Sequence, residues 1–268
     1  MIYSLFLGGL GNCLFQIAAA LSLGWDNQDE DVYFSSYSVS CTPRPEKEKI
    51  WYTTILKDIK QIANKPIIQY VYREPSLLYN KIPYQKNIEL IGYFQNEKYF
   101  SKYKDKIINF FNDYKKNILN KLNLVLNQTS KPKIAIHVRR GDYLQMSDFH
   151  TILSHTDYYE KALNEISNKI NIDDYALYIF SDDINWCNSW DLLKKYKDVY
   201  YISAEVDVHE LYLMSLCEHN IIANSSFSWW GAYLNENKDK IVIYPSNKYY
   251  LGQDVKIDIS CDGWTAIN

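Results

Sequence analysis

The chain has 268 residues, of which 47% are hydrophobic and 23% are charged, a balance typical of soluble globular proteins. Its formal net charge of −3 and its pI of about 6.0 argue against attachment to nucleic acid by bulk positive charge. The five cysteines are an odd number, widely scattered and without a C-x-x-C pair, which argues against a disulfide framework or zinc site and indicates a reducing compartment.

The first predicted element is a strand over residues 2–7, which leads straight into a glycine-rich loop. The segment has no basic region, no cleavage-site pattern and no apolar stretch long enough to span a bilayer. We therefore expect a cytoplasmic protein without a transmembrane segment. This expectation leaves room for peripheral contact with the inner face of a membrane.

The loop Gly8-Gly-Leu-Gly-Asn12 is predicted to join this strand to an apolar helix over residues 14–23. In such a unit, backbone N–H groups and the helix N-terminus can cradle an anion, although in about half of such turns the glycines only permit close packing. The next predicted elements are a strand at 31–35, a loop at 37–48, a helix at 50–63, strands at 66–71 and 89–94, and a long amphipathic helix at about 98–126.

A polar segment with a proline, residues 128–132, is predicted to separate an N-terminal domain (1–130) from a C-terminal domain (131–268). The predicted elements of the second half are strands at 133–138, 176–180, 199–202, 220–223 and 241–244, with helices at 156–170, 186–196, 209–217 and 229–234. Alternation of strands and helices indicates parallel strands with crossover helices, and so a doubly wound sheet.

The apolar strand at 133–138 ends directly in Arg139, Arg140, Gly141 and Asp142. Open α/β sheets bind ligands at the carboxyl ends of their strands, and guanidinium groups match phosphate oxygens, so this segment predicts a phosphate or diphosphate site. The Arg-Gly-Asp tripeptide of cell-adhesion proteins requires an exposed loop tip, which an adjoining apolar strand disfavours. As a structural alternative, one arginine bridges Asp142.

Two further strands of the second half end in polar clusters, which are Ser181, Asp182 and Asp183, and Asn224, Ser225, Ser226 and Ser228. Parallel strands bring their carboxyl ends to one edge, so these clusters and the arginines should converge on one nucleotide-type site. Hydroxyl groups suit phosphates, whereas carboxylates suit ribose or the N–H edge of guanine. The two aspartates could instead bind a divalent metal or cap the next helix, but adjacent side chains on an extended chain point in opposite directions.

Two apolar helices carry residues with competing interpretations. Trp229 and Trp230 could form a platform for a sugar, but aromatic residues at this point of a fold usually belong to the core. His209 and Glu210 are expected at the surface of their helix.

Five segments together resemble the α-1,2-fucosyltransferases. They are Gly8-Gly-Leu-Gly-Asn12, Gly92-Tyr-Phe-Gln-Asn-Glu-Lys-Tyr-Phe100, His137-Val-Arg-Arg-Gly-Asp-Tyr143, Phe180-Ser-Asp-Asp183 and His219-Asn-Ile-Ile-Ala-Asn-Ser-Ser-Phe-Ser-Trp-Trp-Gly231. The resemblance implies a GT-B fold, with two Rossmann-like doubly wound parallel-sheet domains facing across a cleft. It also implies an inverting enzyme that transfers L-fucose from GDP-fucose to the 2-hydroxyl of a terminal galactoside, without a metal or other cofactor.

The resemblance also implies which residues contact GDP-fucose, mainly in the C-terminal half. They are Gly9, Gly11, Asn12, His137, Arg139, Arg140, Asp182, Asp183, Ser225 and Ser226. Arg139, aided by Arg140, would hold the β-phosphate and stabilise the negative charge that grows on the departing GDP. The histidine would lie near the nucleoside, and Asp182 or Asp183 would serve the nucleoside. The serines would lie near the diphosphate, and the backbone of the glycine loop would close over the phosphates. Glu97 and Asp142 are the candidates for a base that accepts the acceptor's proton.

Two positions depart from the pattern of the family and leave fine positioning open. Cys13 stands where the glycine loop usually has Gln, and Glu210 stands where the helix before the last motif usually has Asp. Two other functions stay open beside the main interpretation. One is another GDP-sugar transferase, such as an α-1,6-type fucosyltransferase, and the other is a non-catalytic nucleotide- or glycan-binding protein.

Overall fold

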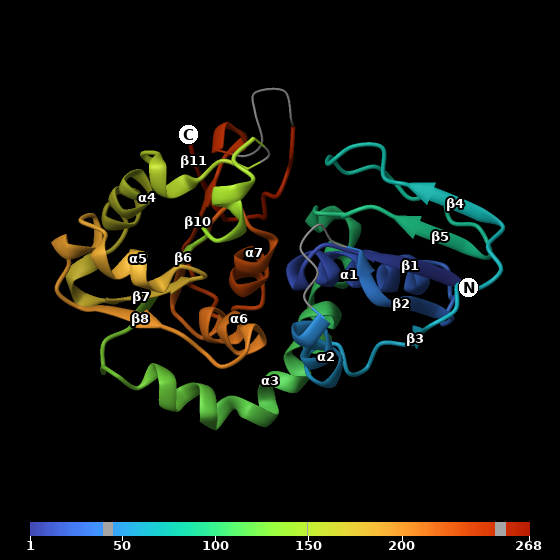
Figure 1. The fold of residues 1–268 in the computed structure, drawn as a ribbon, viewed down its shortest axis with the longest axis horizontal. Helices are drawn as coiled ribbons and strands as arrows, with labels where there is room; N and C mark the ends of the chain where they lie inside the picture. The colour runs from blue at the N-terminus through green and yellow to red at the C-terminus, as the bar shows by residue number, and fades with distance from the viewer. Residues whose placement is uncertain (40–44, 149, 250–255) are drawn as a thin grey trace. The chain divides into compact units, whose positions relative to one another are not determined.

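The computed structural model describes residues 1–39, 45–148, 150–249 and 256–268, and the chain divides into two compact units (Figure 1). Unit 1 is Met1–Lys116 with Lys256–Ser260, and unit 2 is Asn117–Val255 with Cys261–Asn268. Each unit has its own parallel sheet, which confirms the two predicted Rossmann-like domains. The boundary between the units falls after Lys116, within a long helix. The polar segment at 128–132, where the sequence predicts the boundary, begins after that helix has ended.

The sheet of unit 1 has five parallel strands in the order β3-β2-β1-β5-β4. Their bounds are β1 Ile2–Leu7, β2 Val32–Val39, β3 Gln61–Ile62, β4 Tyr70–Arg73 and β5 Ile88–Ile91. From β1 the chain builds the sheet outwards to β2 and β3, and then continues on the other side of β1. The strand order therefore reverses between β1 and β5, and open α/β sheets bind ligands beside the carboxyl ends of strands at such a switch point.

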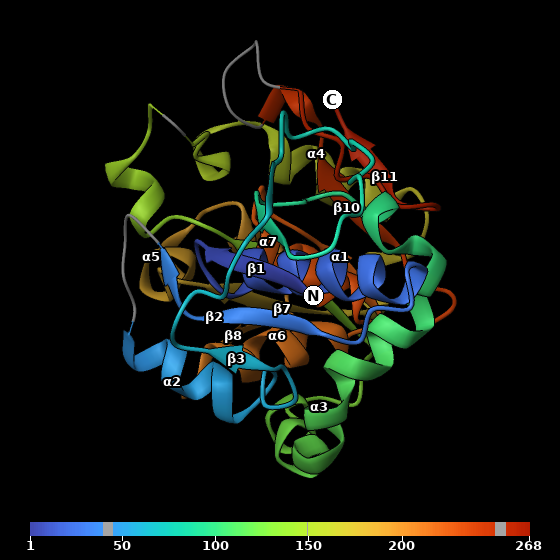
Figure 2. The same cartoon turned by 90° about the vertical axis from the view of Figure 1, so that its right-hand side faces the viewer.

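The helices of unit 1 and the helix that leads to unit 2 follow from the apolar patterns of the chain. They are α1 Leu10–Asp26, α2 Pro45–Thr53, the short 3₁₀ turns Glu97–Tyr99 and Ser101–Tyr103, and α3 Lys104–Leu126. Helix α1 lies beside β1 and β2 (Figure 2) and packs on both strands, and most of its first fourteen residues are buried. The segment Lys256–Ser260 joins unit 1 through a hydrogen bond from Asn96 Nδ2 to the carbonyl of Asp258 (2.8 Å) and an ion pair between Lys98 and Asp258 (3.1 Å).

The sheet of unit 2 has six parallel strands in the order β11-β10-β9-β6-β7-β8. Their bounds are β6 Lys133–Val138, β7 Ala176–Ser181, β8 Val199–Ile202, β9 His219–Ile221, β10 Val242–Pro245 and β11 Thr265–Ile267. The sheet grows from β6 through β7 to β8, and then from β9 outwards on the other side, which is the Rossmann strand order. Its switch point lies between β6 and β9.

The core of unit 2 forms where apolar strand residues meet the apolar faces of helices. The helices are α4 Tyr158–Ser167, α5 Ile184–Ser189, α6 Asp207–Ser215 and α7 Ser226–Tyr233. Ile134, Ile136 and Val138 of β6 are fully buried. Trp229 and Trp230 are at most 1% exposed. The prediction that the two tryptophans belong to the core is therefore confirmed.

The prediction that His209 lies at the surface is wrong, because this residue is only 9% exposed. Glu210 is half-buried, and its carboxylate accepts a hydrogen bond from the backbone N–H of Ala204 (3.2 Å). In the part of the chain that the structure describes, no helix is both long and apolar enough to cross a membrane.

Several predicted boundaries are wrong for local reasons. The helix predicted at 50–63 is α2, which begins at Pro45, a favoured first helical residue, and ends at Thr53, while residues 61–62 form β3. The predicted loop at 37–48 therefore contains the end of β2 and the start of α2, and its residues 40–44 lie outside the described residues. The glycine loop is shorter than predicted because α1 begins at Leu10, and β11 was not predicted.

Candidate functional site

The carboxyl ends of β6, β7 and β9 bring the three predicted polar clusters together at the switch point of unit 2. Strand β6 pairs with β7 along one side and with β9 along the other, so the residues that follow all three strands share one edge. The hydroxyl of Tyr143 donates a hydrogen bond to the carbonyl of Asn224 (3.0 Å), which connects the segment after β6 to the segment after β9. The predicted convergence of the clusters is therefore confirmed.

Arg139 is a fixed positive charge at this edge. Its Nη2 contacts Asp142 Oδ1 at 2.6 Å, its Nη1 contacts Asp182 Oδ2 at 3.0 Å, and 18% of its side chain stays exposed. Burial works against the charged guanidinium, but the two carboxylates outweigh burial and raise the pKa of Arg139. The structural alternative, an arginine that bridges Asp142, is thus present, although protein does not enclose the side chain completely.

Arg140 faces in another direction and is a brace between elements. Its Nε contacts Asp183 Oδ2 at 3.1 Å, its Nη1 donates to Ser154 Oγ (2.8 Å), and its guanidinium stacks on the ring of Trp186 at 3.6 Å. Only 7% of the side chain is exposed. The guanidinium is engaged by the protein itself, so its predicted contact with a phosphate stays a prediction.

The two aspartates after β7 have separate partners, as expected for adjacent residues on an extended chain. Asp182 binds Arg139 with one oxygen and accepts the backbone N–H of Arg140 with the other (2.9 Å). Asp183 caps α5 by accepting the N–H of Trp186 (3.3 Å), which confirms the capping alternative and explains why this helix starts before the predicted residue 186. Among the described residues, no group of three or more His, Cys, Asp or Glu side chains could hold a metal ion.

Gly141 is required by the close approach of Asp182. A Cβ atom at this position would lie 2.3 Å from Asp182 Oδ2, far inside a van der Waals contact. The glycine therefore lets the carboxylate bind Arg139 and the backbone N–H of Arg140 at the same time.

His137 is a buried and neutral imidazole beneath this cluster. The residue is 4% exposed, and within the described residues its Nδ1 has no hydrogen-bond partner. Burial, with a further contribution from the charge of Arg139, lowers the pKa of His137 to about 3. Its ring lies 5.8 Å from the ring of Phe227, which belongs to the first turn of α7. The Nδ1 nitrogen is itself enclosed by protein, so His137 lies beneath the cluster as a buried, uncharged group.

The segment after β9 is held by Asn224, whose supporting role the sequence did not reveal. Its Nδ2 donates to the carbonyl of Thr151 (2.8 Å) and to the carbonyl of Tyr249 (3.1 Å), so it connects two loops at the site. Ser225 is the N-cap residue of α7 and is 9% exposed, and Ser226 begins the helix. The sequence signals for Asn224 are its place at a strand end and in the segment His219–Gly231, and neither indicates these hydrogen bonds.

The glycine loop of unit 1 is organised around Asn12. Gly8 has a φ of +82°, and a Cβ there would lie 2.2 Å from Asn12 Nδ2. Gly9 is the N-cap of α1, and Gly11 and Asn12 lie in its first turn, where the backbone N–H of Asn12 donates to the carbonyl of Gly9 (3.0 Å). Cys13 is fully buried, and burial raises the pKa of its thiol to about 12, so the departure from the family pattern introduces no reactive thiolate.

The two candidate bases belong to different units. Glu97 lies in a 3₁₀ turn of unit 1, 15% exposed, with Lys104 Nζ at 3.6 Å. Asp142 lies in unit 2, 22% exposed, and is ion-paired with Arg139. Both carboxylates have a cationic partner, and neither is singled out as a base by its surroundings.

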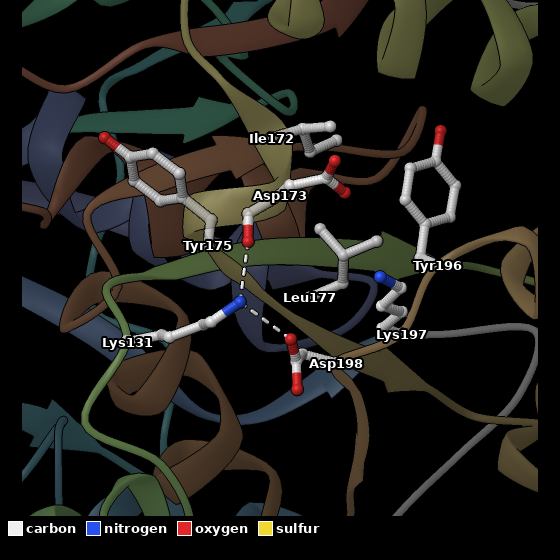
Figure 3. Close-up of a pocket in the computed structure, with 8 residues that line it drawn as sticks. All are labelled: Lys131, Ile172, Asp173, Tyr175, Leu177, Tyr196, Lys197 and Asp198. Atoms are coloured by element: carbon white, nitrogen blue, oxygen red, sulfur yellow. Dashed lines mark hydrogen bonds and ion pairs between the residues drawn. The ribbon is translucent and has the colours of Figure 1, made fainter.

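A cavity of about 130 Å³ lies at the opposite, amino-terminal edge of the unit 2 sheet (Figure 3). Its lining residues are Lys131, Ile172, Asp173, Tyr175, Leu177, Tyr196, Lys197 and Asp198. Lys131 Nζ closes one side by binding the carbonyl of Asp173 (2.6 Å) and Asp198 Oδ2 (2.8 Å). None of the predicted site residues lines this cavity, and it is distinct from the site at the switch point.

The sequence is similar to known glycosyltransferases along nearly its whole length. It is 33% identical to the O-antigen biosynthesis glycosyltransferase WbnK of Escherichia coli, over 98% of this chain and 99% of that protein. It is 28% identical to an α-1,2-colitosyltransferase of Escherichia coli, over 97% and 96% of the two chains.

A similarity in structure supports the fold. The crystal structure of the fucosyltransferase NodZ from Bradyrhizobium matches with a TM-score of 0.51 and 11% identity, over 86% of this chain and 92% of that one. The two Rossmann-like domains are those of the GT-B class. The model of Glycosyl transferase family 11 matches residues 34–268, and the chain therefore belongs to this family.

Proposed function

We propose that the protein is an inverting glycosyltransferase that moves L-fucose from GDP-fucose to the 2-hydroxyl of a terminal galactoside. Its membership of glycosyl transferase family 11 supports the class of reaction, and a relative named as an α-1,2-transferase supports the linkage. The observation that carries the proposal is the placement of Arg139. Its guanidinium lies at the switch point of a Rossmann sheet, fixed between two carboxylates and still partly exposed.

Arg139 would act on the leaving group. Displacement at the anomeric carbon develops negative charge on the departing GDP, and a preorganised guanidinium stabilises that charge without reorganisation. Asp142 and Asp182 each take one edge of the guanidinium, and the remaining N–H groups would bind phosphate oxygens. A fixed organic cation in this place would remove the need for a divalent metal, and we propose that the reaction requires none.

Other residues of the edge would bind the donor without changing their charge during the reaction. His137 stays neutral at physiological pH, so it would lie near the nucleoside as an uncharged group and would not transfer a proton. Ser225 and Ser226, at the start of α7, would place hydroxyl and N–H groups near the diphosphate. Arg140, which is engaged with Asp183 and Trp186, would support the site from behind.

The test is incubation of the purified protein with GDP-fucose and lactose, followed by linkage analysis of the product. We expect α-1,2-linked fucose on galactose. A product with an α-1,6 linkage would replace the proposed linkage, and GDP binding without turnover would favour the non-catalytic alternative.

The second candidate function is the transfer of a different deoxy sugar. The observation that favours it is the 28% identity to a colitosyltransferase over 97% of the chain. Competition between GDP-fucose and GDP-colitose in the same assay separates the two donors. A higher kcat/KM for the colitose donor would establish this second function.

The base that receives the acceptor's proton is proposed to be Asp142 or Glu97. Comparison of Asp142→Asn and Glu97→Gln separates them, because each variant removes the carboxylate at nearly constant volume. A variant that retains turnover within a few-fold of the wild type excludes its residue. Asp142→Asn also unpairs Arg139, so the affinity for GDP must be measured beside turnover in that variant.

A further inference from the structure

Unit 1 has a switch point of its own, between β1 and β5, where two segments are connected by side chains. The glycine loop follows β1, and the turn Gly92–Asn96 follows β5. Gln16 Nε2 donates to the carbonyl of Gly92 (3.0 Å), and Gln95 Nε2 donates to Asn12 Oδ1 (2.7 Å). The turn and the glycine loop therefore form one hydrogen-bonded structure at the edge where α/β sheets bind ligands.

The turn contains an unfavourable backbone conformation that Glu74 holds in place. Phe94 has a φ of +52°, in the left-handed region that bulky residues rarely adopt, although its side chain is completely buried. Glu74 Oε2 accepts the backbone N–H groups of Tyr93 (2.7 Å) and Phe94 (3.0 Å), and the hydroxyl of Tyr99 donates to Oε1 (3.4 Å). A Cβ on Gly92 would lie 2.4 Å from the Cβ of Glu74, so the turn needs glycine there.

The carboxylate of Glu74 is in an unfavourable environment. Burial raises its pKa above the ordinary value, even though three hydrogen-bond donors act in the opposite direction. Backbone strain like that of Phe94 persists where the surrounding structure requires one geometry, and it is concentrated at functional sites.

The turn presents an aromatic side chain to solvent. Tyr93 is 40% exposed, although it is flanked by Gly92 and by the fully buried Phe94. Tyr79, also 40% exposed, packs its ring on Tyr99 at 4.9 Å, and Tyr99 packs on Phe94 at 5.3 Å. Exposed tyrosine rings supply apolar contact area together with a polar hydroxyl, which suits the mixed surface of a sugar.

We propose that Glu74 is a positioning residue for the acceptor, because it holds the Gly92–Phe94 turn so that Tyr93 forms a surface on which the acceptor sugar packs. The inference rests on the proposed glycosyl transfer. Glu74 does not contact the reacting atoms in this role. It acts through the backbone of Tyr93 and Phe94.

The experiment compares five variants of the full chain in steady-state kinetics with GDP-fucose and a galactoside acceptor. Glu74→Ala removes the acceptor of two backbone hydrogen bonds, and we expect the acceptor KM to rise about tenfold or more while the donor KM is unchanged. Tyr93→Ala should raise the acceptor KM in the same way, and Tyr93→Phe should retain it. Glu74→Gln keeps one oxygen for both N–H groups and should restore a nearly normal acceptor KM. Glu30→Ala, at an exposed residue before β2 on the opposite edge of the sheet, is the matched control.

Hydrolysis of GDP-fucose without an acceptor provides the readout that separates positioning from general damage. We expect Glu74→Ala to hydrolyse the donor at the wild-type rate. The proposal would be overturned if Glu74→Ala slowed donor hydrolysis by the same factor as it raised the acceptor KM and also lowered the melting temperature. A normal acceptor KM in Glu74→Ala would overturn it as well. If Glu74→Ala does not fold, Tyr93→Ala decides, because an unchanged acceptor KM in that exposed-site variant also overturns it.

The wild-type measurement separates failure of this inference from failure of the proposed function. A wild-type protein that transfers no sugar to any galactoside refutes the proposed function. A wild-type protein that does transfer fucose, with an acceptor KM that neither Glu74 nor Tyr93 affects, refutes only the role of the turn.

Discussion

Replacement of Arg139 by lysine tests the proposed mechanism, because it retains the positive charge and removes the planar group. Arg139 contacts Asp142 at 2.6 Å and Asp182 at 3.0 Å through two different nitrogens. A lysine ammonium is a compact point charge that cannot span both carboxylates and a phosphate with the same geometry. We therefore expect Arg139→Lys to lower both turnover and stability, and to lower turnover more.

The expected loss in turnover follows from the role of the guanidinium in the transition state. Removal of one donor that stabilises developing charge lowers turnover by about 10²- to 10³-fold, which corresponds to about 3–4 kcal/mol. The expected loss in stability is smaller. The side chains of Arg139, Asp142 and Asp182 are 18%, 22% and 25% exposed, and the variant weakens one charged hydrogen bond, about 1–3 kcal/mol.

The assay measures kcat per folded molecule, the affinity for GDP by calorimetry and the melting temperature on one preparation. Asp198→Asn is the matched control, because the Lys131–Asp198 ion pair (2.8 Å) lies at the opposite edge of the same sheet. Both partners are more than a third exposed, so the control should lose at most about 1 kcal/mol and retain normal turnover.

The result that refutes the mechanism is a specific one. If Arg139→Lys lowers the melting temperature but each folded molecule still turns over at a rate close to the wild type, Arg139 only braces the fold. A loss of GDP affinity without a loss of kcat would mean that the guanidinium binds the ground state and the transition state equally.

Three further variants or conditions test other parts of the site. Gly141→Ala introduces a Cβ 2.3 Å from Asp182 Oδ2, and by displacing that carboxylate it should weaken GDP binding about tenfold; unchanged affinity in calorimetry would contradict the close approach. The pKa of His137 is about 3 in the folded protein and about 6.5 in an unfolded chain, so the unfolded chain binds more protons in this range. The free energy of unfolding should therefore fall as the pH drops from 6.5 towards 3, by up to about 1.4 kcal/mol per pH unit. Denaturant titrations at several pH values should show that this free energy depends less steeply on pH in His137→Gln than in the wild type. Activity should survive excess EDTA, and a loss that Mn²⁺ or Mg²⁺ restores would refute metal independence.

The parts of the fold that the sequence predicts well are those that the local pattern determines. Strands β6 and β8 occupy the residues predicted for them, because short apolar runs bounded by polar residues and turns have few other interpretations. The location of the site was also predictable. Parallel strands place their carboxyl ends on one edge, so the polar clusters after β6, β7 and β9 converge without any knowledge of side-chain packing.

The parts that the sequence could not predict depend on tertiary contacts. Arg139 and Arg140 are adjacent and chemically identical, and only the packing of Trp186 and Asp183 shows that the second is a buried brace. The role of Glu74 depends on the pairing of β4 with β5, which brings it to the N–H groups of Tyr93 and Phe94. No short sequence window contains both partners of these contacts.

The return of Lys256–Ser260 to unit 1 has a practical consequence for dissecting the protein. A fragment that starts near residue 130 would carry this segment without its partners, and Ile257 and Ile259, each only 6% exposed in the whole chain, would lose their cover. A single cut therefore cannot excise either domain cleanly. Chimeras that exchange the C-terminal half between relatives need one extra junction before Lys256 and another after Ser260, so that these five residues stay with unit 1.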